Sequence, residues 1–110
     1  MNIKQIEKSV AGVKIFVEED GKEIGRAWLY LIHNNLHIEP YGLLEDVYVD
    51  ENYRKRGVGN KLLKKIIALA KEKKCYKLLA TSRHSRKEVH GWYERLGFKE
   101  YGSAFRMDLK

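Results

Sequence analysis

The chain has 110 residues, 44% of them hydrophobic and 34% charged, which predicts one soluble domain over residues 1–110 and excludes a disordered chain. No apolar run reaches the length of a membrane span, and residues 1–5 lack the apolar stretch of a secretory signal. Cys75 is the only cysteine, so no intrachain disulfide forms and a cytoplasmic location is expected.

The net charge of +7 is unevenly distributed along the sequence. Residues 1–53 carry 5 basic and 10 acidic side chains, whereas residues 54–77 carry 10 basic and 1 acidic. The positive charge therefore begins abruptly at Arg54, which favours an anionic ligand near the middle of the chain. Nucleic acid, an anionic membrane and a phosphorylated cofactor all satisfy this pattern, and a solvated lysine-rich helix is the alternative without a ligand.

The first half of the chain predicts strands. Residues 13–17 are rich in β-branched and aromatic side chains, Asp20-Gly21 is a hairpin turn signal, and residues 24–32 predict the returning strand. After polar residues that predict a turn, residues 36–38 are expected to continue the sheet. Residues 43–49 predict a further strand, which ends at a polar, turn-like segment.

The second half alternates helices and strands. A helix is predicted over residues 59–73, because its apolar residues form one stripe at helical spacing. These residues are Leu62, Leu63, Ile66, Ile67, Leu69 and Ala70. Residues 77–81 predict a strand, and residues 98–109 predict one or two more.

Between those strands lies a second predicted helix. Ser85 and Glu88 have the spacing of a capping box at its start, and Gly97 is suited to end it. The order of elements predicts an α/β (α+β) fold, a mixed, mostly antiparallel sheet of about six strands flanked by helices.

The segment Arg54-Lys55-Arg56-Gly57-Val58-Gly59 joins a predicted strand to a predicted helix. A helix start offers unpaired N–H groups and a positive dipole end, and glycines let a phosphate approach the backbone. The N–H groups from Lys55 to Asn60 are therefore expected to form a phosphate cradle. An ordinary glycine-containing turn is the alternative. The segment lacks the Gly-Lys-Ser/Thr of a P-loop and the third glycine of a dinucleotide fingerprint.

Residues 54–59 resemble a signature of the Gcn5-related N-acetyltransferases, the GNAT family. In that signature, Gln or Arg is followed after two residues by Gly-x-Gly/Ala. Residues 45–53 resemble the strand that leads into the signature. Residues 92–98, Trp-Tyr-Glu-Arg-Leu-Gly-Phe, resemble an aromatic-Tyr-Glu-x-x-Gly-Phe element on a later helix. The resemblance covers about residues 13–109 and implies an acyl-CoA N-acyltransferase fold.

The resemblance also implies a cofactor, acetyl-CoA, and how it binds. Its pantetheine arm would lie along the strand segment Val47-Tyr48-Val49, where the sheet splays apart. The backbone from Lys55 to Asn60 would hold the pyrophosphate. Arg86 stands where the family often has an asparagine, and it is a candidate phosphate contact in that residue's place. Residues 1–12 are too few for the usual first strand and two helices, which leaves an open groove or a second subunit of a homodimer to complete the acceptor site.

The implied reaction moves the acetyl group to a primary amine by direct attack in a ternary complex. The amine must first lose a proton, and Glu45, two residues before Val47, is the first candidate base, with Asp46 as the second. Simple alternation places Glu45, Val47 and Val49 on one face of the strand, unless a β-bulge interrupts it. Tyr93 matches the family tyrosine that donates a proton to the leaving thiolate. A backbone N–H, that of Val47, is the expected oxyanion donor.

Two other functions remain as alternatives. A non-catalytic acyl-CoA-binding sensor or partner module would keep the phosphate cradle but use neither Glu45 nor Tyr93. A nucleic-acid-binding domain is disfavoured, because residues 54–74 contain no aromatic side chain among the basic ones. The four histidines and Cys75 lack the spacing of a metal site, so no metal is expected.

Overall fold

A hairpin of two long strands begins the folded part of the chain. The computed structural model describes all 110 residues, and its first strands are β1 (Ala11–Glu19) and β2 (Lys22–Ile32). The two strands pair antiparallel with a two-residue connection, Asp20-Gly21. Both turn residues have a positive φ, 53° and 77°, as a hairpin turn compatible with the strand twist requires. The predicted hairpin is confirmed.

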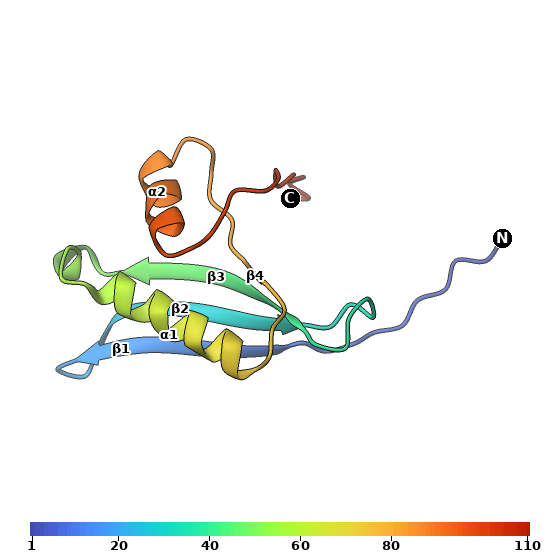
Figure 1. Cartoon of the computed structure of the whole chain (residues 1–110), viewed down its shortest axis with the longest axis horizontal. Helices are drawn as coiled ribbons and strands as arrows, with labels where there is room; N and C mark the ends of the chain where they lie inside the picture. The colour runs from blue at the N-terminus through green and yellow to red at the C-terminus, as the bar shows by residue number, and fades with distance from the viewer. The chain divides into compact units, whose positions relative to one another are not determined.

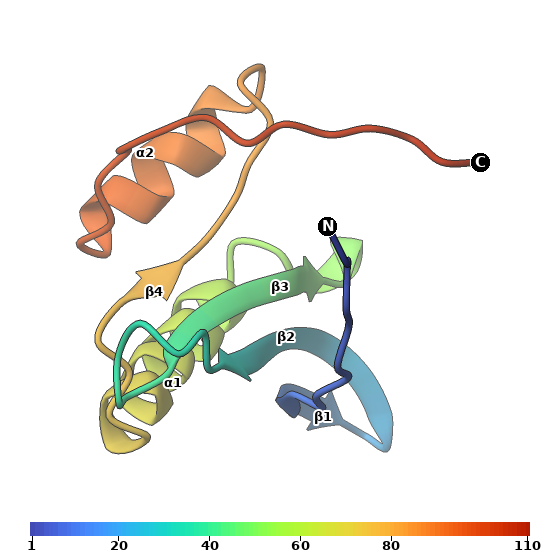
Figure 2. The same ribbon diagram turned by 90° about the vertical axis from the view of Figure 1, so that its right-hand side faces the viewer.

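Two further strands complete a mixed sheet in the order β1-β2-β3-β4 (Figure 1). The long strand β3 (Tyr41–Val49) pairs antiparallel with β2. The short strand β4 (Leu78–Leu79) pairs parallel with the beginning of β3 (Figure 2). The mostly antiparallel mixed sheet is confirmed, but it has four strands rather than about six.

Two of the predicted strands, at residues 36–38 and 98–109, are absent. In the segment 36–38, the Asn34 side-chain oxygen accepts a hydrogen bond from the Leu36 N–H at 3.1 Å, and Asn35 has a left-handed φ of 63°. This turn chemistry outweighs the apolar pattern, and Leu36 and Ile38 are exposed. Residues 98–109 form no strand either.

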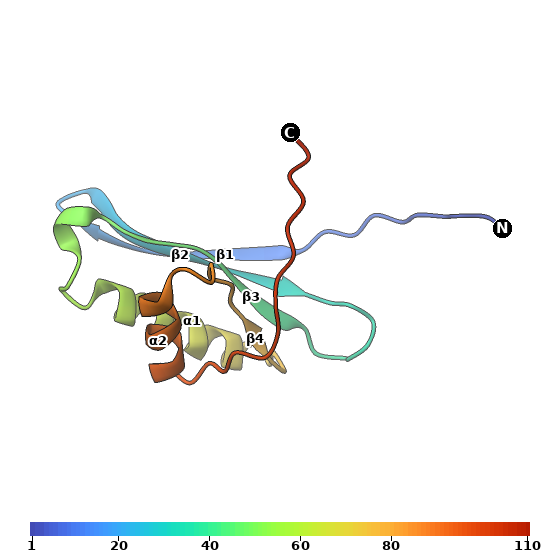
Figure 3. The same cartoon turned by 90° about the horizontal axis from the view of Figure 1, so that it is seen from above.

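One helix, α1 (Val58–Glu72), covers one face of the sheet (Figure 3). Its side chains at helical spacing pack against apolar residues of β2 and β3, and together they form the core. The buried residues are Leu62, Leu63, Ile66 and Ala70 of the helix, and Ala27, Leu29 and Leu44 of the sheet. The predicted apolar stripe is therefore confirmed, and the opposite face of the sheet carries the polar side chains described below.

The chain divides into two compact units, residues 1–80 and residues 81–110. The second unit contains α2 (Lys87–Arg95), which begins after Arg86 with no side-chain cap. The predicted capping box at Ser85 is wrong, because the Arg86 N–H closes a turn onto Arg83 O at 3.0 Å instead. The prediction of a single domain stays a prediction. Neither helix has the length and the apolar run that a bilayer crossing requires.

Gly97 ends α2 as predicted. It has a φ of 105°, and its N–H donates to Glu94 O while the Phe98 N–H donates to Tyr93 O, both at 3.0 Å. This pair of bonds is a Schellman motif, in which the residue after the glycine often contacts the helix three residues from its end. The Phe98 and Tyr93 rings make that contact, with centroids 5.3 Å apart.

Candidate functional site

A β-bulge interrupts β3 at the residues expected to carry the chemistry. Arg26 of β2 lies opposite Tyr48 and Trp28 lies opposite Glu45, so β3 has one more residue than β2 between these pairs. Asp46 occupies the bulge with a left-handed φ of 51°. Bulges of this kind are frequent beside active sites, where they re-aim side chains.

The bulge changes which side chains share a face, and it corrects the simple alternation expected for this strand. Glu45 lies opposite Trp28 and Tyr48 opposite Arg26, and Asp46 is ion-paired with Arg26, so these three lie on the face away from α1. Val49 lies opposite Gly25, which contacts α1. Glu45 and Asp46 are therefore on one face, because the inserted residue reverses the alternation after Glu45.

The bulge also determines which backbone groups reach the edge of β3 that faces β4. The Gly42 N–H donates to Lys77 O at 2.9 Å, so the backbone groups of Gly42 point toward β4. The register between β3 and β4 covers only Gly42 and Leu43. From Leu44 onward, this edge of β3 has no paired strand, which agrees with the splayed sheet that the resemblance implies.

Val47 and Val49 direct their backbone groups to that unpaired edge. The Asp50 N–H donates to Ile24 O of β2 at 2.7 Å. Backbone groups alternate between the two edges of a strand, so Val49 and Val47 point away from β2. The Val49 carbonyl oxygen indeed accepts a hydrogen bond from Arg54 Nε at 3.0 Å, outside the sheet. The Val47 N–H is thus aimed at the open edge.

The two candidate bases differ in their surroundings. The Arg26 guanidinium contacts the Asp46 carboxylate through two hydrogen bonds, Nε to Oδ2 at 2.8 Å and Nη2 to Oδ1 at 3.2 Å. This contact lowers the pKa of Asp46, chiefly through its hydrogen bonds. Glu45 is exposed and takes part in none of the ion pairs. Glu45 is therefore the freer carboxylate for accepting a proton.

Between β3 and α1 the chain forms a single 3-10 turn, η1 (Glu51–Tyr53). The Asp50 carboxylate caps it by accepting from the Asn52 N–H at 2.9 Å. That hydrogen bond, with Lys22 at 3.2 Å, lowers the pKa of Asp50. This cap ends β3 and turns the chain toward the basic segment, whose position is therefore defined by local contacts.

The start of α1 has the features of an anion site. Lys55 and Gly57 have left-handed φ values of 66° and 79°, and the first helical hydrogen bond runs from the Lys61 N–H to Gly57 O at 3.1 Å. The N–H groups of Val58 and Gly59 precede that bond, so the helix supplies no carbonyl for them. No side chain caps the helix, its first turn holds no acidic residue, and a Cβ at Gly57 would meet nothing within 4 Å.

The charges around this helix start oppose the helix dipole. Arg54, Lys55 and Arg56 lie at the positive end of the dipole, where cations are unfavourable and anions are favourable. Arg56 is partly held by Glu19, at 3.7 Å, and by the Tyr53 ring, 5.0 Å from its centroid. Nothing in the first turn offsets this arrangement, and a bound phosphate would do so.

The other predicted site residues lie in the second unit. The Tyr93 ring packs between its neighbours, with centroids 5.6 Å from Trp92 and 5.3 Å from Phe98. Arg86 is exposed at the start of α2, where its carbonyl accepts from the N–H groups of Val89 and His90. His90 Nε2 lies 2.8 Å from Arg83 O, so its ring is engaged with the backbone.

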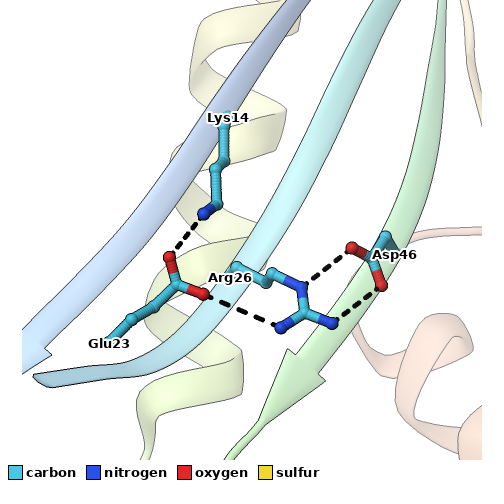
Figure 4. Close-up of polar contacts among 4 residues, drawn as sticks. All are labelled: Lys14, Glu23, Arg26 and Asp46. Carbon is cyan, nitrogen blue, oxygen red and sulfur yellow. Dashed lines mark hydrogen bonds and ion pairs between the residues drawn. The ribbon is translucent and has the colours of Figure 1, made fainter.

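Arg26 is the residue of the site that sequence reasoning missed. Besides Asp46, its guanidinium contacts Glu23 at 3.7 Å and lies 4.8 Å from the Tyr48 ring centroid. Glu23 also pairs with Lys14, so four charges of alternating sign cross the sheet face (Figure 4). The available signal was a charged residue inside an otherwise apolar strand, Gly25 to Leu29. No group of three or more His, Cys, Asp or Glu side chains could hold a metal ion.

Comparison with known proteins identifies the family. The model described as the acetyltransferase (GNAT) family matches residues 3–98, and the chain belongs to this family. The match covers both the bulged strand and the basic helix start, as well as α2.

Individual relatives agree with this assignment. The chain is 38% identical over 68 residues to a glucosamine 6-phosphate N-acetyltransferase of Trypanosoma brucei brucei, covering 62% of this chain and 44% of that relative. It is 32% identical over 96 residues to an aminoglycoside N(6')-acetyltransferase type 1 of Stenotrophomonas maltophilia, covering 83% and 63%. The chain thus spans less than two thirds of each of these relatives.

A solved structure supports the fold. A crystal structure of an acetyltransferase from Trypanosoma brucei matches with a TM-score of 0.81 at 29% identity, over 89% of this chain and 69% of that chain. The expected acyltransferase fold is therefore confirmed, although four strands are present where about six were predicted.

Proposed function

We propose that this chain binds acetyl-CoA and transfers its acetyl group to a primary amine by direct attack in a ternary complex. The observation that carries the proposal is the helix start at Gly57, an uncapped, cation-rich end of α1 that follows the open edge of β3. The pyrophosphate would bind the N–H groups from Lys55 to Asn60, with Arg54 and Arg56 beside it. The pantetheine arm would lie along Val47-Tyr48-Val49.

The chemistry requires four events that balance. Glu45 accepts a proton from the ammonium, directly or through water, because only the neutral amine is a nucleophile. The amine nitrogen then bonds to the thioester carbonyl carbon, whose oxygen gains negative charge and accepts from the Val47 N–H. The carbon–sulfur bond breaks as the Tyr93 hydroxyl donates its proton to the CoA thiolate. The nitrogen of the new amide then loses its second proton, which returns to the Tyr93 oxygen directly or through water. The products are an acetylated amine, free CoA and the proton that Glu45 releases to solvent.

The freedom of Glu45 supports its role as the base. Asp46, the second candidate, is engaged by Arg26 and has a lowered pKa, which makes it a weaker proton acceptor. Arg86, which stands where the family often has an asparagine, is a further candidate phosphate contact. We further propose a cytoplasmic location, in agreement with the single free cysteine, Cys75.

The acceptor class is proposed from charge and from the names of relatives. Two relatives are named for glucosamine 6-phosphate and for aminoglycosides, which supports an amine on a small polar molecule. The carboxylates of Glu45 and Asp46 on the exposed sheet face favour a cationic group over an anionic one.

Binding is tested first, by thermal shift with acetyl-CoA and with double-stranded DNA at one salt concentration. Acetyl-CoA at micromolar levels should raise Tm, because a ligand that binds only the folded state stabilises it. Arg56→Ala should weaken this shift and its dependence on salt, whereas Lys65→Ala, an equal loss of charge in the middle of α1, should not. Stabilisation by DNA alone would contradict the proposal.

Turnover is tested by the release of free CoA thiol with a panel of amines: glucosamine 6-phosphate, glucosamine, an aminoglycoside and a lysine-containing peptide. Amine-dependent release that Tyr93→Phe slows is the expected result. A chain that binds acetyl-CoA but releases thiol with none of these amines, and whose behaviour Tyr93→Phe leaves unchanged, would instead be a non-catalytic acyl-CoA-binding module.

A further inference from the structure

Arg26 contacts both residues that flank Val47. Its guanidinium makes two hydrogen bonds to Asp46, at 2.8 Å and 3.2 Å, and lies 4.8 Å from the centroid of the Tyr48 ring. Arg26 lies directly opposite Tyr48 in the β2–β3 register. The side chains on either side of Val47 are thus held on one face of the sheet by a single residue of the neighbouring strand, whose pairing with Asp46 is drawn in Figure 4.

The conformation that this contact holds is an unfavourable one for the backbone. Asp46 has a φ of 51°, in the left-handed region that residues other than glycine seldom occupy. In a strand without the extra residue, the backbone groups would alternate regularly between the two edges. Those of Asp46 and Tyr48 would then reach the open edge. With the bulge, those of Val47 and Val49 reach it instead. The direction of the Val47 N–H therefore depends on the bulge.

A second carboxylate, that of Glu23, also holds the Arg26 guanidinium. Glu23 Oε2 lies 3.7 Å from Arg26 Nη1, and Glu23 Oε1 pairs with Lys14 Nζ of β1. The Arg26 side chain is 31% exposed, compared with 53% for Asp46. A planar guanidinium that binds a carboxylate through two parallel bonds defines its orientation, which a single ammonium does not.

We propose that Arg26 is a positioning residue for acetyl transfer, holding the Asp46 bulge so that the Val47 N–H points to the thioester oxygen. The inference rests on the proposed function, in which Val47 is the oxyanion donor. Arg26 touches neither the cofactor nor the amine in this role. Its effect is on the rate of the chemical step, since a donor displaced by about 1 Å loses much of its contribution.

The first test is kinetic. Arg26→Ala is expected to lower kcat by about 10- to 100-fold, with a small change in the KM for acetyl-CoA. Arg26→Lys, which keeps the charge but not the paired hydrogen bonds, is expected to restore part of the loss. Lys22→Ala, which breaks the Lys22–Asp50 ion pair outside the bulge, is the matched control and should keep the wild-type kcat.

A double-mutant cycle separates this role from a general loss of stability. In an Asp46→Gly background the left-handed conformation needs no ion pair, so adding Arg26→Ala should change kcat less than twofold. Equal effects of Arg26→Ala in the two backgrounds would overturn the proposal. A wild-type kcat for Arg26→Ala would overturn it as well.

The second test does not depend on activity. The φ of residue 46 and the amide shift of Val47, measured by NMR in wild type, Arg26→Lys and Arg26→Ala, report the bulge directly. We expect both to change in Arg26→Ala and to change less in Arg26→Lys. An unaltered φ at residue 46 would refute the inference, even in a chain that releases no thiol, so its failure is distinguishable from failure of the proposed function.

Discussion

A Cβ atom at Gly25 would lie 2.8 Å from Cγ1 of Val58, the first residue of α1. Gly25 is buried on β2, and the helix start packs directly on its backbone. The same Cβ would lie 3.2 Å from Leu62 Cδ1 and 3.4 Å from the Tyr48 carbonyl oxygen. The position of the proposed phosphate site relative to the sheet thus depends on a residue without a side chain.

Gly25→Ala is therefore expected to destabilise the fold by about 1–3 kcal/mol, because Val58 is buried at 9% exposure and cannot move away freely. Urea denaturation measures the change. Gly91→Ala is the control and should stabilise the fold, since its Cβ would meet only the end of the exposed Arg95 side chain, at 3.3 Å, and alanine favours a helix. A stability for Gly25→Ala equal to that of wild type would show that α1 is not held at this distance.

The other end of α1 offers a stabilising substitution. Lys74 follows the helix with a left-handed φ of 62°, and its N–H donates to Lys71 O while the Cys75 N–H donates to Ala70 O, both at 3.0 Å. This is a Schellman motif in which glycine is the usual residue.

Lys74→Gly should raise the free energy of unfolding by about 0.5–1 kcal/mol. Glycine relieves the strain of the left-handed conformation, and the greater conformational freedom that it gives the unfolded chain offsets part of this gain. Lys73→Gly, one residue earlier at a φ of −80°, should lower it instead. Thermal and urea unfolding of the two variants give the comparison. The same sign for both substitutions would contradict the assignment of the motif.

Local signals in the sequence were sufficient for the hairpin and for α1. Asp20-Gly21 is a turn whose residues favour positive φ, and the stripe from Leu62 to Ala70 has helical spacing over several turns. Gly57 could be recognised as part of a phosphate cradle because it follows three cations and lies between a predicted strand and a predicted helix. These features depend on neighbours along the chain, which the sequence displays.

The features that depend on neighbours in space were harder to predict. One inserted residue at Asp46 reverses the alternation of β3, and the residue that holds it, Arg26, is 20 positions away. The failed strand at 36–38 and the failed cap at Ser85 have a common cause. Side-chain and backbone hydrogen bonds of local turns compete with the pattern from which an element is predicted.

The Arg26–Asp46 pair makes the stability of the fold depend on pH in the acid range. Because Arg26 lowers the pKa of Asp46 in the folded state, the stabilisation is fully present above the unfolded value, near 3.9, and is lost as the pH falls through the lower folded value. Asp46→Asn keeps a residue that tolerates a positive φ but removes the charge.

We expect wild type to exceed Asp46→Asn in stability by a constant amount between about pH 5 and 8, and the difference to shrink below about pH 4. The pair is exposed, so the difference is small and also falls with added salt. Urea denaturation across this pH range is the measurement. A difference that persists unchanged at pH 2 would mean that the charge of Asp46 contributes nothing.

Glu45 and Asp46 have different proposed roles, and pH profiles distinguish them. Glu45→Gln should lower kcat by about 10²- to 10⁴-fold, because it removes the group that accepts the amine proton, while Glu39→Gln, an exposed carboxylate in the 33–40 loop, should leave kcat unchanged.

When the base is lost, the plot of kcat/KM against pH changes shape. The rising limb of the plot then reports deprotonation of the amine alone. Loss of a positioning contact, as in Asp46→Asn, lowers the plot but keeps its shape. If Glu45→Gln only lowers the curve and Asp46→Asn reshapes it, Asp46 is the base, despite its pairing with Arg26.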